Sequence, residues 1–461
     1  MLPTPLLSQR VEQYARQPEH RARWVRELRE LLAFPSISAT ARDRAHVAAA
    51  AAWLATHLAR IGLHNARVLP GSRGGPPSVY ADWLQAPGQR TLLCYGHYDV
   101  QPAGPLATWR TPPFQPEIVN QYLFARGASD DKGQLFIHLK AIESYLSGVG
   151  GLPINVKVWL EGEEEVGSPN LSAFLDCATE RLRADAVLIS DTEMSAPHQP
   201  SIVYGLRGQV SLDLEVSGAP RDLHAGRYGG AVLNPLQALC ELIAGLHDNH
   251  NRIAVPGVYA RVRAISPRER QQLRCQTGEH SELRYRPARG EPGYTGFERT
   301  VLRPALVVQG MGGGKVGSEG PVVVPGRASA RLSMRLVPDQ EPAEIGRLLI
   351  RHLARTAPPG SRLRTRITAG SRPVLLSPRQ LAVAAAARAV RATWHVPPVL
   401  TRSGGTIPVV DQLHRRLGAP IVLLGFGLAS DNIHSANERL SLPRFFRGVQ
   451  TVVRFIAEYA A

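Results

Sequence analysis

The sequence is poor in cysteine and contains no long apolar run. Its 461 residues include four cysteines, Cys94, Cys177, Cys240 and Cys275, without a CxxC pair. Scattered thiols of this kind fit a reducing compartment and argue against a disulfide framework or a cysteine metal site. No apolar run approaches the length of a membrane span, and residues 1–10 lack the continuous apolar core of a signal peptide. We therefore expect a cytoplasmic protein with no membrane partner, whose metal ligands, if any, are His, Asp and Glu.

Lysine is also scarce, which bears on the high net charge. The formal charge of +16 would suit a nucleic-acid partner, but only four of the 54 basic residues are lysines. The arginines are spread along the whole chain, without a basic block interleaved with aromatic residues. We therefore expect no nucleic-acid partner.

Strand and helix patterns divide the chain into two expected domains. The length allows two or more domains, and strands alternate with helices at both ends of the chain, which predicts an α/β domain with a mostly parallel sheet. After about residue 208 the pattern changes to that of a smaller α+β domain, and the α/β pattern resumes near residue 375. We expect an α/β domain built from 1–208 and 375–461, with 209–374 inserted. Its expected N-terminal elements are helices over 9–33 and 43–62 and strands over 79–83, 91–95, 154–160 and 186–191.

Acids and a histidine stand at the ends of three expected strands. His97 and Asp99 follow one strand, Glu164 and Glu165 follow the next, and Asp191 ends a third. The carboxyl ends of parallel strands share one edge of a sheet, where open α/β sheets bind their ligands. Asp99 has the spacing needed to orient the His97 ring. These groups are therefore expected to lie close together.

Two further segments carry acids or a histidine in loops. Asp130 and Asp131 precede an apolar run with helical spacing, where they could be no more than a helix cap. The run 163–165 could be solvated surface, and His434 alone is ambiguous. Taken together, two histidines and several carboxylates form a hard ligand set suited to two divalent ions that share one carboxylate.

A glycine-rich segment at 310–315 suggests a nucleotide-binding protein as an alternative. It fails as a P-loop because Gln309 stands where the first glycine belongs. Val316 also stands where Ser or Thr is needed to bind magnesium. We therefore interpret this segment as a glycine-rich loop.

The order of the motifs resembles that of the dinuclear zinc peptidase family. This family includes carnosinase-type dipeptidases, glutamate carboxypeptidase, succinyl-diaminopimelate desuccinylase and acetylornithine deacetylase. Further runs at 204–208, 222–226 and 404–408 point to the carnosinase-like dipeptidase branch. The motifs that carry the family resemblance lie at 95–102, 127–133, 160–168, 190–191 and 434–438.

The resemblance implies a ligand for every position of a two-metal site. It implies that Asp130 bridges the two ions, that Glu164 is the general base and later the acid, and that Asp99 orients His97. It also implies a cis peptide between Asp130 and Asp131. Zinc is the first expectation, although such ligand sets accept manganese and cobalt. The implied ligands are His97, Asp130 and Asp191 for one ion, and Asp130, Glu165 and His434 for the other.

The same resemblance assigns roles in the inserted domain, which would be a ferredoxin-like lid and dimerisation domain. His224 matches a histidine that reaches the active site of the other subunit and stabilises the oxyanion, which implies a homodimer. Arg335 matches an arginine that binds the substrate carboxylate. Apart from the family pattern, His224 would be a surface histidine and Arg335 one arginine among many. Further residues on the substrate side are Gly404, Gly405 and Thr406.

The expected function is hydrolysis of the amide bond of dipeptides or short peptides, by water activated between two divalent metals. The alternative with the same site is an N-acyl amino acid amidohydrolase. A non-catalytic binding protein would normally have lost a ligand, and none is missing. Carnosinase-type members carry a further histidine where the chain leaves the lid. Residues 374–380 contain none, which argues against a carnosine-like substrate.

Overall fold

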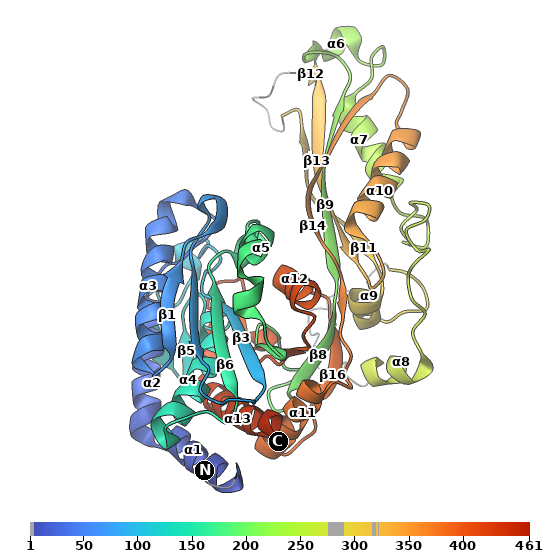
Figure 1. The fold of residues 1–461 in the computed structure, drawn as a ribbon. Coiled ribbons are helices and arrows are strands. Elements are labelled where there is room, and N and C mark those ends of the chain that lie inside the picture. Colours follow the sequence, from blue (N-terminus) through green and yellow to red (C-terminus); the bar gives the residue numbers. More distant parts are fainter. Residues whose placement is uncertain (1–3, 275–289, 316–319, 321) are drawn as a thin grey trace. The chain divides into compact units, whose positions relative to one another are not determined.

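A computed structural model describes residues 4–274, 290–315, 320 and 322–461 (Figure 1). Cys275 and Val316 therefore lie outside the described residues. The chain forms two compact units. The large unit comprises residues 1–204, 376–401 and 407–461, and the inserted unit comprises 205–375 and 402–406.

The large unit is built on a mixed sheet. Its centre is four parallel strands in the order β6 (Asn155–Glu161), β3 (Thr91–His97), β7 (Ala186–Ile189) and β17 (Ile421–Leu423). The expected α/β class is confirmed, with parallel pairing confined to these central strands. The antiparallel strands on one side are β2 (Ser78–Trp83) and β1 (His64–Leu69), and the next strand on the other side is β8 (Ser201–Leu206). The last two residues of β8 belong to the inserted unit and pair there with β15 (Val374–Leu375). A further strand, β16 (Val399–Ser403), pairs with β8.

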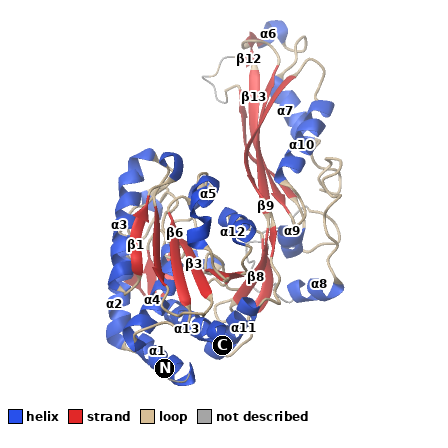
Figure 2. Ribbon diagram, viewed as in Figure 1, coloured by secondary structure: helices blue, strands red, loops and turns tan. Residues whose placement is uncertain are grey.

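Helices cover this sheet (Figure 2). The single helix predicted over 9–33 is wrong, because the chain breaks at Gln17. Gln17 has an extended backbone, with φ −63° and ψ 130°, and Pro18 is the first residue of the next helix. Proline disfavours a helical conformation in the residue before it, so one helix ends and another begins here. The helices are α1 (Thr4–Arg16), α2 (Pro18–Leu32), α3 (Arg44–Arg60), α4 (Lys132–Val149), α5 (Leu171–Leu182), α11 (Leu381–Trp394), α12 (Pro408–Leu417) and α13 (Leu442–Ala460).

Helix α4 is the most deeply buried helix of this unit. Every residue from Lys132 to Tyr145 is buried, so the helix has no solvent-facing side over this length. It packs against α1, α2, α13 and β3. Because its first residue directly follows Asp130 and Asp131, the core packing of α4 fixes the position of that loop.

The inserted unit has a four-stranded antiparallel sheet in the order β11 (Ala305–Gly313), β13 (Arg327–Leu336), β9 (Gly208–Ser217) and β14 (Arg362–Ser371). Helices α7 (Pro235–Ala244) and α10 (Pro342–Thr356) pack on its apolar face. The chain order β9–α7–β11–β13–α10–β14 is the ferredoxin-like arrangement. Smaller elements are β10 (Leu223–His224), β12 (Val323–Val324), α6 (Ala225–Tyr228), α8 (Pro267–Arg274) and α9 (Gly296–Leu302).

The remaining elements of the large unit are short. A small sheet contains β4 (Glu117–Val119), β5 (Tyr122–Phe124) and β18 (Arg439–Ser441). Single 3-10 turns lie at Ala41–Asp43, Ser72–Gly74, Leu106–Thr108, Glu164–Val166 and Ala429–Asp431.

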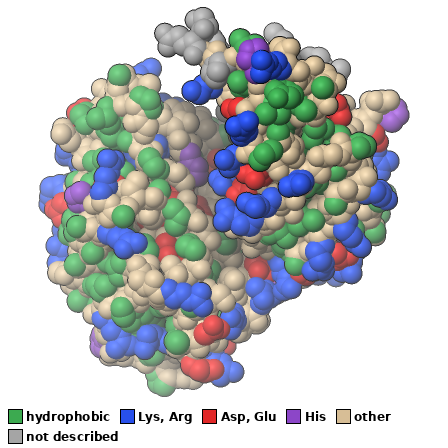
Figure 3. Space-filling model, turned by 90° about the horizontal axis from the view of Figure 1, so that it is seen from above, with side chains coloured by type: hydrophobic (Ala, Val, Ile, Leu, Met, Phe, Trp, Pro, Cys, Tyr) green, Lys and Arg blue, Asp and Glu red, His purple; other side chains and the backbone are tan. Residues whose placement is uncertain are grey.

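Within the described part of the chain, no helix has the length and apolarity to cross a membrane. On the face shown in Figure 3, Lys and Arg side chains are widely distributed, with Asp and Glu among them.

Candidate metal centre

Three parallel strands carry site residues to one edge of the large sheet. Strand β3 ends at His97, β6 is followed by the turn containing Glu164 and Glu165, and β7 is followed by Asp191. His97 Nε2 lies 3.9 Å from Asp191 Oδ2. The strand ends therefore converge at the edge where open α/β sheets bind ligands.

The loops of Asp130 and His434 meet at the same edge. Strands β5 and β18, which pair in the small sheet, hold the two loops side by side. Asp130 Oδ1 lies 3.1 Å from His97 Nε2, and Asp130 Oδ2 lies 2.8 Å from His434 Nε2. His434 Nε2 is also 3.1 Å from Glu165 Oε2. The peptide bond between Asp130 and Asp131 is cis, as the family resemblance implied.

Two groups of three side chains share Asp130. In each group, one ligand atom per residue lies within 4.8 Å of the others. Glu165 Oε1 is buried and has no hydrogen-bond partner among the described residues, so it is free to bind a cation. The oxygen and imidazole donors suit zinc, manganese or cobalt. The residues therefore fit a pair of divalent ions, with His97, Asp130 and Asp191 in one group and Asp130, Glu165 and His434 in the other.

The electrostatics of the cluster favour a bound cation. Burial and, next to it, the charge of the neighbouring Asp130 carboxylate raise the pKa of Asp191 to about 7. Withdrawal from water also raises the pKa of Glu164 well above its usual range. Hydrogen bonds to Asp130 and Glu165 raise the pKa of His434 to about 10. Carboxylates crowded in this way gain stability from added positive charge, which a divalent ion supplies.

Asp99 connects His97 to the Glu164 turn. Its Oδ1 accepts a hydrogen bond from the backbone N–H of Glu164 at 3.1 Å, and its Oδ2 accepts one from Glu165 at 3.0 Å. Asp99 Oδ1 also lies 3.5 Å from His97 Nδ1. His97 Nδ1 also contacts the backbone carbonyl of Asp99 at 3.2 Å, so Asp99 holds both the imidazole and the turn that carries two of the acids.

The three acids of the 163–165 run face different partners. Glu163 accepts hydrogen bonds from the backbone N–H and the side-chain amide of Asn170, both at 2.9 Å. Glu165 belongs to the group of Asp130 and His434. Glu164 is half-buried between them, close enough to His97 and Asp191 for their charges to affect its pKa. The run is therefore divided, and Glu163 takes no part in the cluster.

Glu438 is a site residue to which the sequence analysis gave no role. Its Oε1 accepts from the backbone N–H groups of Ser129 and Asp130, at 2.9 and 3.0 Å. Its Oε2 accepts from the backbone N–H of Gly127 and from Arg126 Nη1, at 2.9 and 2.8 Å. This fully buried carboxylate lies four residues after His434 and so ties the two ligand loops together. Its place in the His434 motif was the available signal, but its partners lie about 310 residues away.

A Glu438→Gln variant is expected to bind metal about 10- to 100-fold more weakly, with a similar loss of activity. The amide keeps the size of the side chain but turns an N–H₂ group toward two of the four donors. Metal affinity by competition with a chelating dye would measure the effect. Glu458→Gln is the matched control, because Glu458 pairs with Arg388 on the surface. Unchanged affinity in the Glu438 variant would contradict the positioning role.

Residues expected on the substrate side lie together in the inserted unit. Arg335 Nη1 donates to Thr406 Oγ1 at 2.9 Å. Arg207, which the sequence analysis treated only as part of a motif, donates from Nε to the Gly404 carbonyl at 3.0 Å. Burial, together with the charge of Arg335, lowers the pKa of Arg207 to about 10. Two neighbouring guanidinium groups of this kind suit an anionic group.

His224 also lies in the inserted unit, at the end of β10. Its side chain is exposed, and its Nδ1 accepts a hydrogen bond from the backbone N–H of Gly226 at 3.1 Å. An exposed histidine is available to another subunit, but it fits an ordinary surface residue equally well.

A hard ligand set at the carboxyl edge of an α/β sheet, with an inserted ferredoxin-like unit, is typical of metal-dependent hydrolases. The model of peptidase family M20/M25/M40 matches residues 93–458. The chain belongs to this family, which confirms the family resemblance of the motifs.

Curated relatives and solved structures cover nearly the whole chain. The Cys-Gly metallodipeptidase DUG1 of Candida albicans is 28% identical over 473 aligned residues, which cover 96% of this chain and 95% of that protein. The human Beta-Ala-His dipeptidase is 29% identical over 480 residues, with 99% and 94% coverage. The structure of the M20 family metallo-carboxypeptidase Sso-CP2 from Sulfolobus solfataricus matches with a TM-score of 0.86, 30% identity and coverage of 95% and 99%.

Proposed function

We propose that the protein hydrolyses the amide bond of dipeptides or short peptides with the help of two divalent metal ions. The observation that carries this proposal is the pair of ligand groups that share Asp130, next to Glu164. The names of two relatives, a Cys-Gly metallodipeptidase and a Beta-Ala-His dipeptidase, support dipeptide substrates. They do not favour the N-acyl amino acid alternative.

In this proposal Asp130 is the shared ligand. His97 and Asp191 complete one group, and Glu165 and His434 complete the other. Zinc is the first candidate, and manganese or cobalt also suits these donors. When bound, the ions supply Lewis acidity, which lowers the pKa of a water molecule and polarises the scissile carbonyl.

Glu164 is proposed to move the proton. Its carboxylate takes a proton from the attacking water and later delivers it to the leaving amine. Asp99 contributes by holding the His97 ring and, through two backbone N–H groups, the turn of Glu164.

The inserted unit is proposed to bind substrate and to form a homodimer. Arg335, supported by Thr406 and the Gly404–Gly405 segment, would bind the substrate carboxylate, since a guanidinium can hold it with two hydrogen bonds. His224 of one subunit would stabilise the oxyanion in the site of the other. A fully active monomer would contradict this role.

The free thiols of Cys94, Cys177 and Cys240 support a cytoplasmic location.

Amino-acid release from a panel of free dipeptides and a panel of N-acyl amino acids tests the proposed function. We expect cleavage of dipeptides that a chelator abolishes and added zinc or manganese restores, because the ligand groups alone cannot supply Lewis acidity. Cleavage of the acylated panel alone would make the protein a deacylase. No cleavage in either panel by the metal-loaded protein would contradict the proposal.

A further inference from the structure

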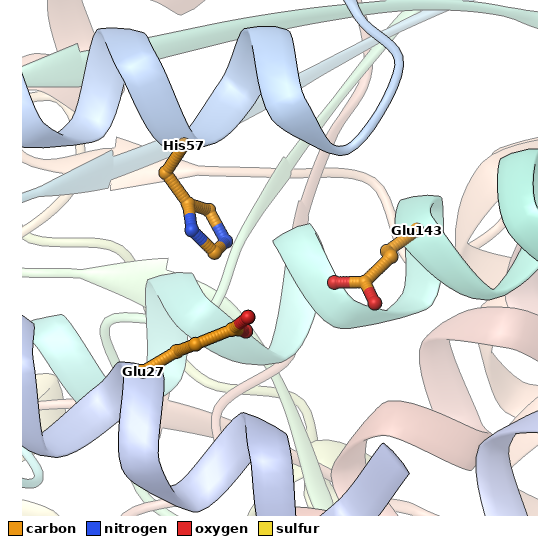
Figure 4. Close-up of side chains that lie close together, drawn as sticks. All are labelled: Glu27, His57 and Glu143. Carbon is orange, nitrogen blue, oxygen red and sulfur yellow. The ribbon is translucent and has the colours of Figure 1, made fainter.

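A second cluster of ligand-type side chains lies inside the large unit, between three helices. Glu27 of α2, His57 of α3 and Glu143 of α4 point toward one another (Figure 4). All three are buried, and one ligand atom of each lies within 4.8 Å of the others. Two carboxylate oxygens and one imidazole nitrogen are the donors that zinc takes in proteins. By composition alone, this cluster resembles a third metal site.

Lys140 occupies the centre of this cluster. Its Nζ lies 2.5 Å from Glu27 Oε2, 2.7 Å from Glu143 Oε2 and 2.9 Å from His57 Nε2. An ammonium group has three N–H donors and no acceptor, so its capacity matches the three surrounding atoms. The Lys140 side chain is completely buried, with 0% of its surface exposed.

The other oxygen of each glutamate already has partners. Glu27 Oε1 accepts from Arg23 at 3.0 Å and from Arg60 at 3.2 Å. Glu143 Oε1 accepts from Trp24 Nε1 at 3.1 Å and pairs with Arg23. Both glutamates are therefore held with Oε2 directed at the centre, while the arginines that bind their other oxygens are partly exposed to solvent.

His57 is held in the form that a cation needs. Burial, together with the charges of Lys140 and Arg60, lowers the pKa of His57 to about 2, so the ring is neutral. Trp53 stacks on the ring, with the two centroids 4.8 Å apart. The neutral imidazole and the two Oε2 atoms would thus remain in place if the ammonium were removed.

We propose that the cluster of Glu27, His57 and Glu143 is a cation site that the chain fills with its own ammonium group, Lys140. The lysine excludes a divalent ion from the natural protein, and loss of its amine converts the cluster into a site for zinc. The ammonium joins α2 and α3 to α4, the helix that follows Asp130 and Asp131. The packing of α4 behind the candidate metal centre therefore does not depend on the supply of metal.

Counting bound ions in matched variants tests this proposal. The natural protein, Lys140→Ala, the double variant Lys140→Ala/His57→Ala and the control Lys157→Ala would each be equilibrated with buffered zinc and analysed by plasma mass spectrometry. Lys157 is a fair control because its Nζ donates to the Arg183 carbonyl, outside the cluster. We expect one additional ion per protomer in Lys140→Ala only, because the double variant lacks the imidazole ligand.

Either of two results would overturn the proposal. An unchanged count in folded Lys140→Ala, as judged by circular dichroism, would show that the cluster cannot hold an ion. The single variant His57→Ala, which keeps Lys140, would be measured as well. If it bound one zinc ion fewer per protomer than the natural protein, a metal would already occupy the cluster. This measurement does not require any Lys140 variant to fold. Only differences between variants are used, so the outcome does not depend on the ion number or activity at the candidate metal centre.

Discussion

A Glu164→Gln variant is expected to lose about 10²- to 10⁴-fold in kcat, because its amide cannot accept and return a proton. Glu164 is close enough to both ligand groups for their charges to affect its pKa, but it belongs to neither of them. The metal content of the Glu164→Gln variant should therefore stay at the level of the natural protein. Steady-state kinetics on a dipeptide, combined with ion counting on the same sample, would separate loss of proton transfer from loss of metal.

The neighbouring acid provides a control for this variant. Glu163 has the same chemistry and lies one residue away, but its carboxylate binds Asn170. Glu163→Gln is therefore expected to keep kcat near the natural value. If both variants were equally impaired, or if Glu164→Gln lost its metal, Glu164 would not be the general base.

Replacing Asp130 with Ala is expected to weaken both metal positions and to reduce activity at least as much as the Glu164 variant. Asp130 lies 3.1 Å from His97 and 2.8 Å from His434 through its two different oxygens, so its removal takes a ligand from each group. Two ions held about 3.5–4 Å apart depend on such a shared carboxylate to offset their repulsion. Ion counting at fixed free zinc would measure the loss.

Asp191→Ala is the comparison for this prediction. Asp191 belongs only to the group with His97, so its loss should leave the group of Asp130, Glu165 and His434 able to bind one ion. An Asp130→Ala protein that still binds two ions per protomer would show that Asp130 is not the bridge.

Much of the fold follows from local sequence patterns. Apolar strands that end in polar ligand-type residues predicted which groups would meet, because parallel strands place their carboxyl ends at one edge. His97, Glu165 and Asp191 lie at that edge in the structure. The break between α1 and α2 is also local, since it follows from Pro18, but the apolar periodicity continues across it and concealed it. Periodicity reports which side chains face the core, not where the backbone bends.

The contacts that complete the site depend on tertiary structure. Glu438 holds the Asp130 loop from a position about 310 residues further along the chain, and nothing near either segment records that pairing. In the sequence, Lys140 is also no more than a polar residue within a helix. In the structure, two glutamates and a histidine from α2, α3 and its own helix α4 surround its ammonium group. The sequence by itself determined the family, the order of the motifs and the kinds of ligand. Which buried charge meets which partner was decided by the packing of distant segments, because a buried ion is stable only where folding supplies its counter-charge and hydrogen bonds.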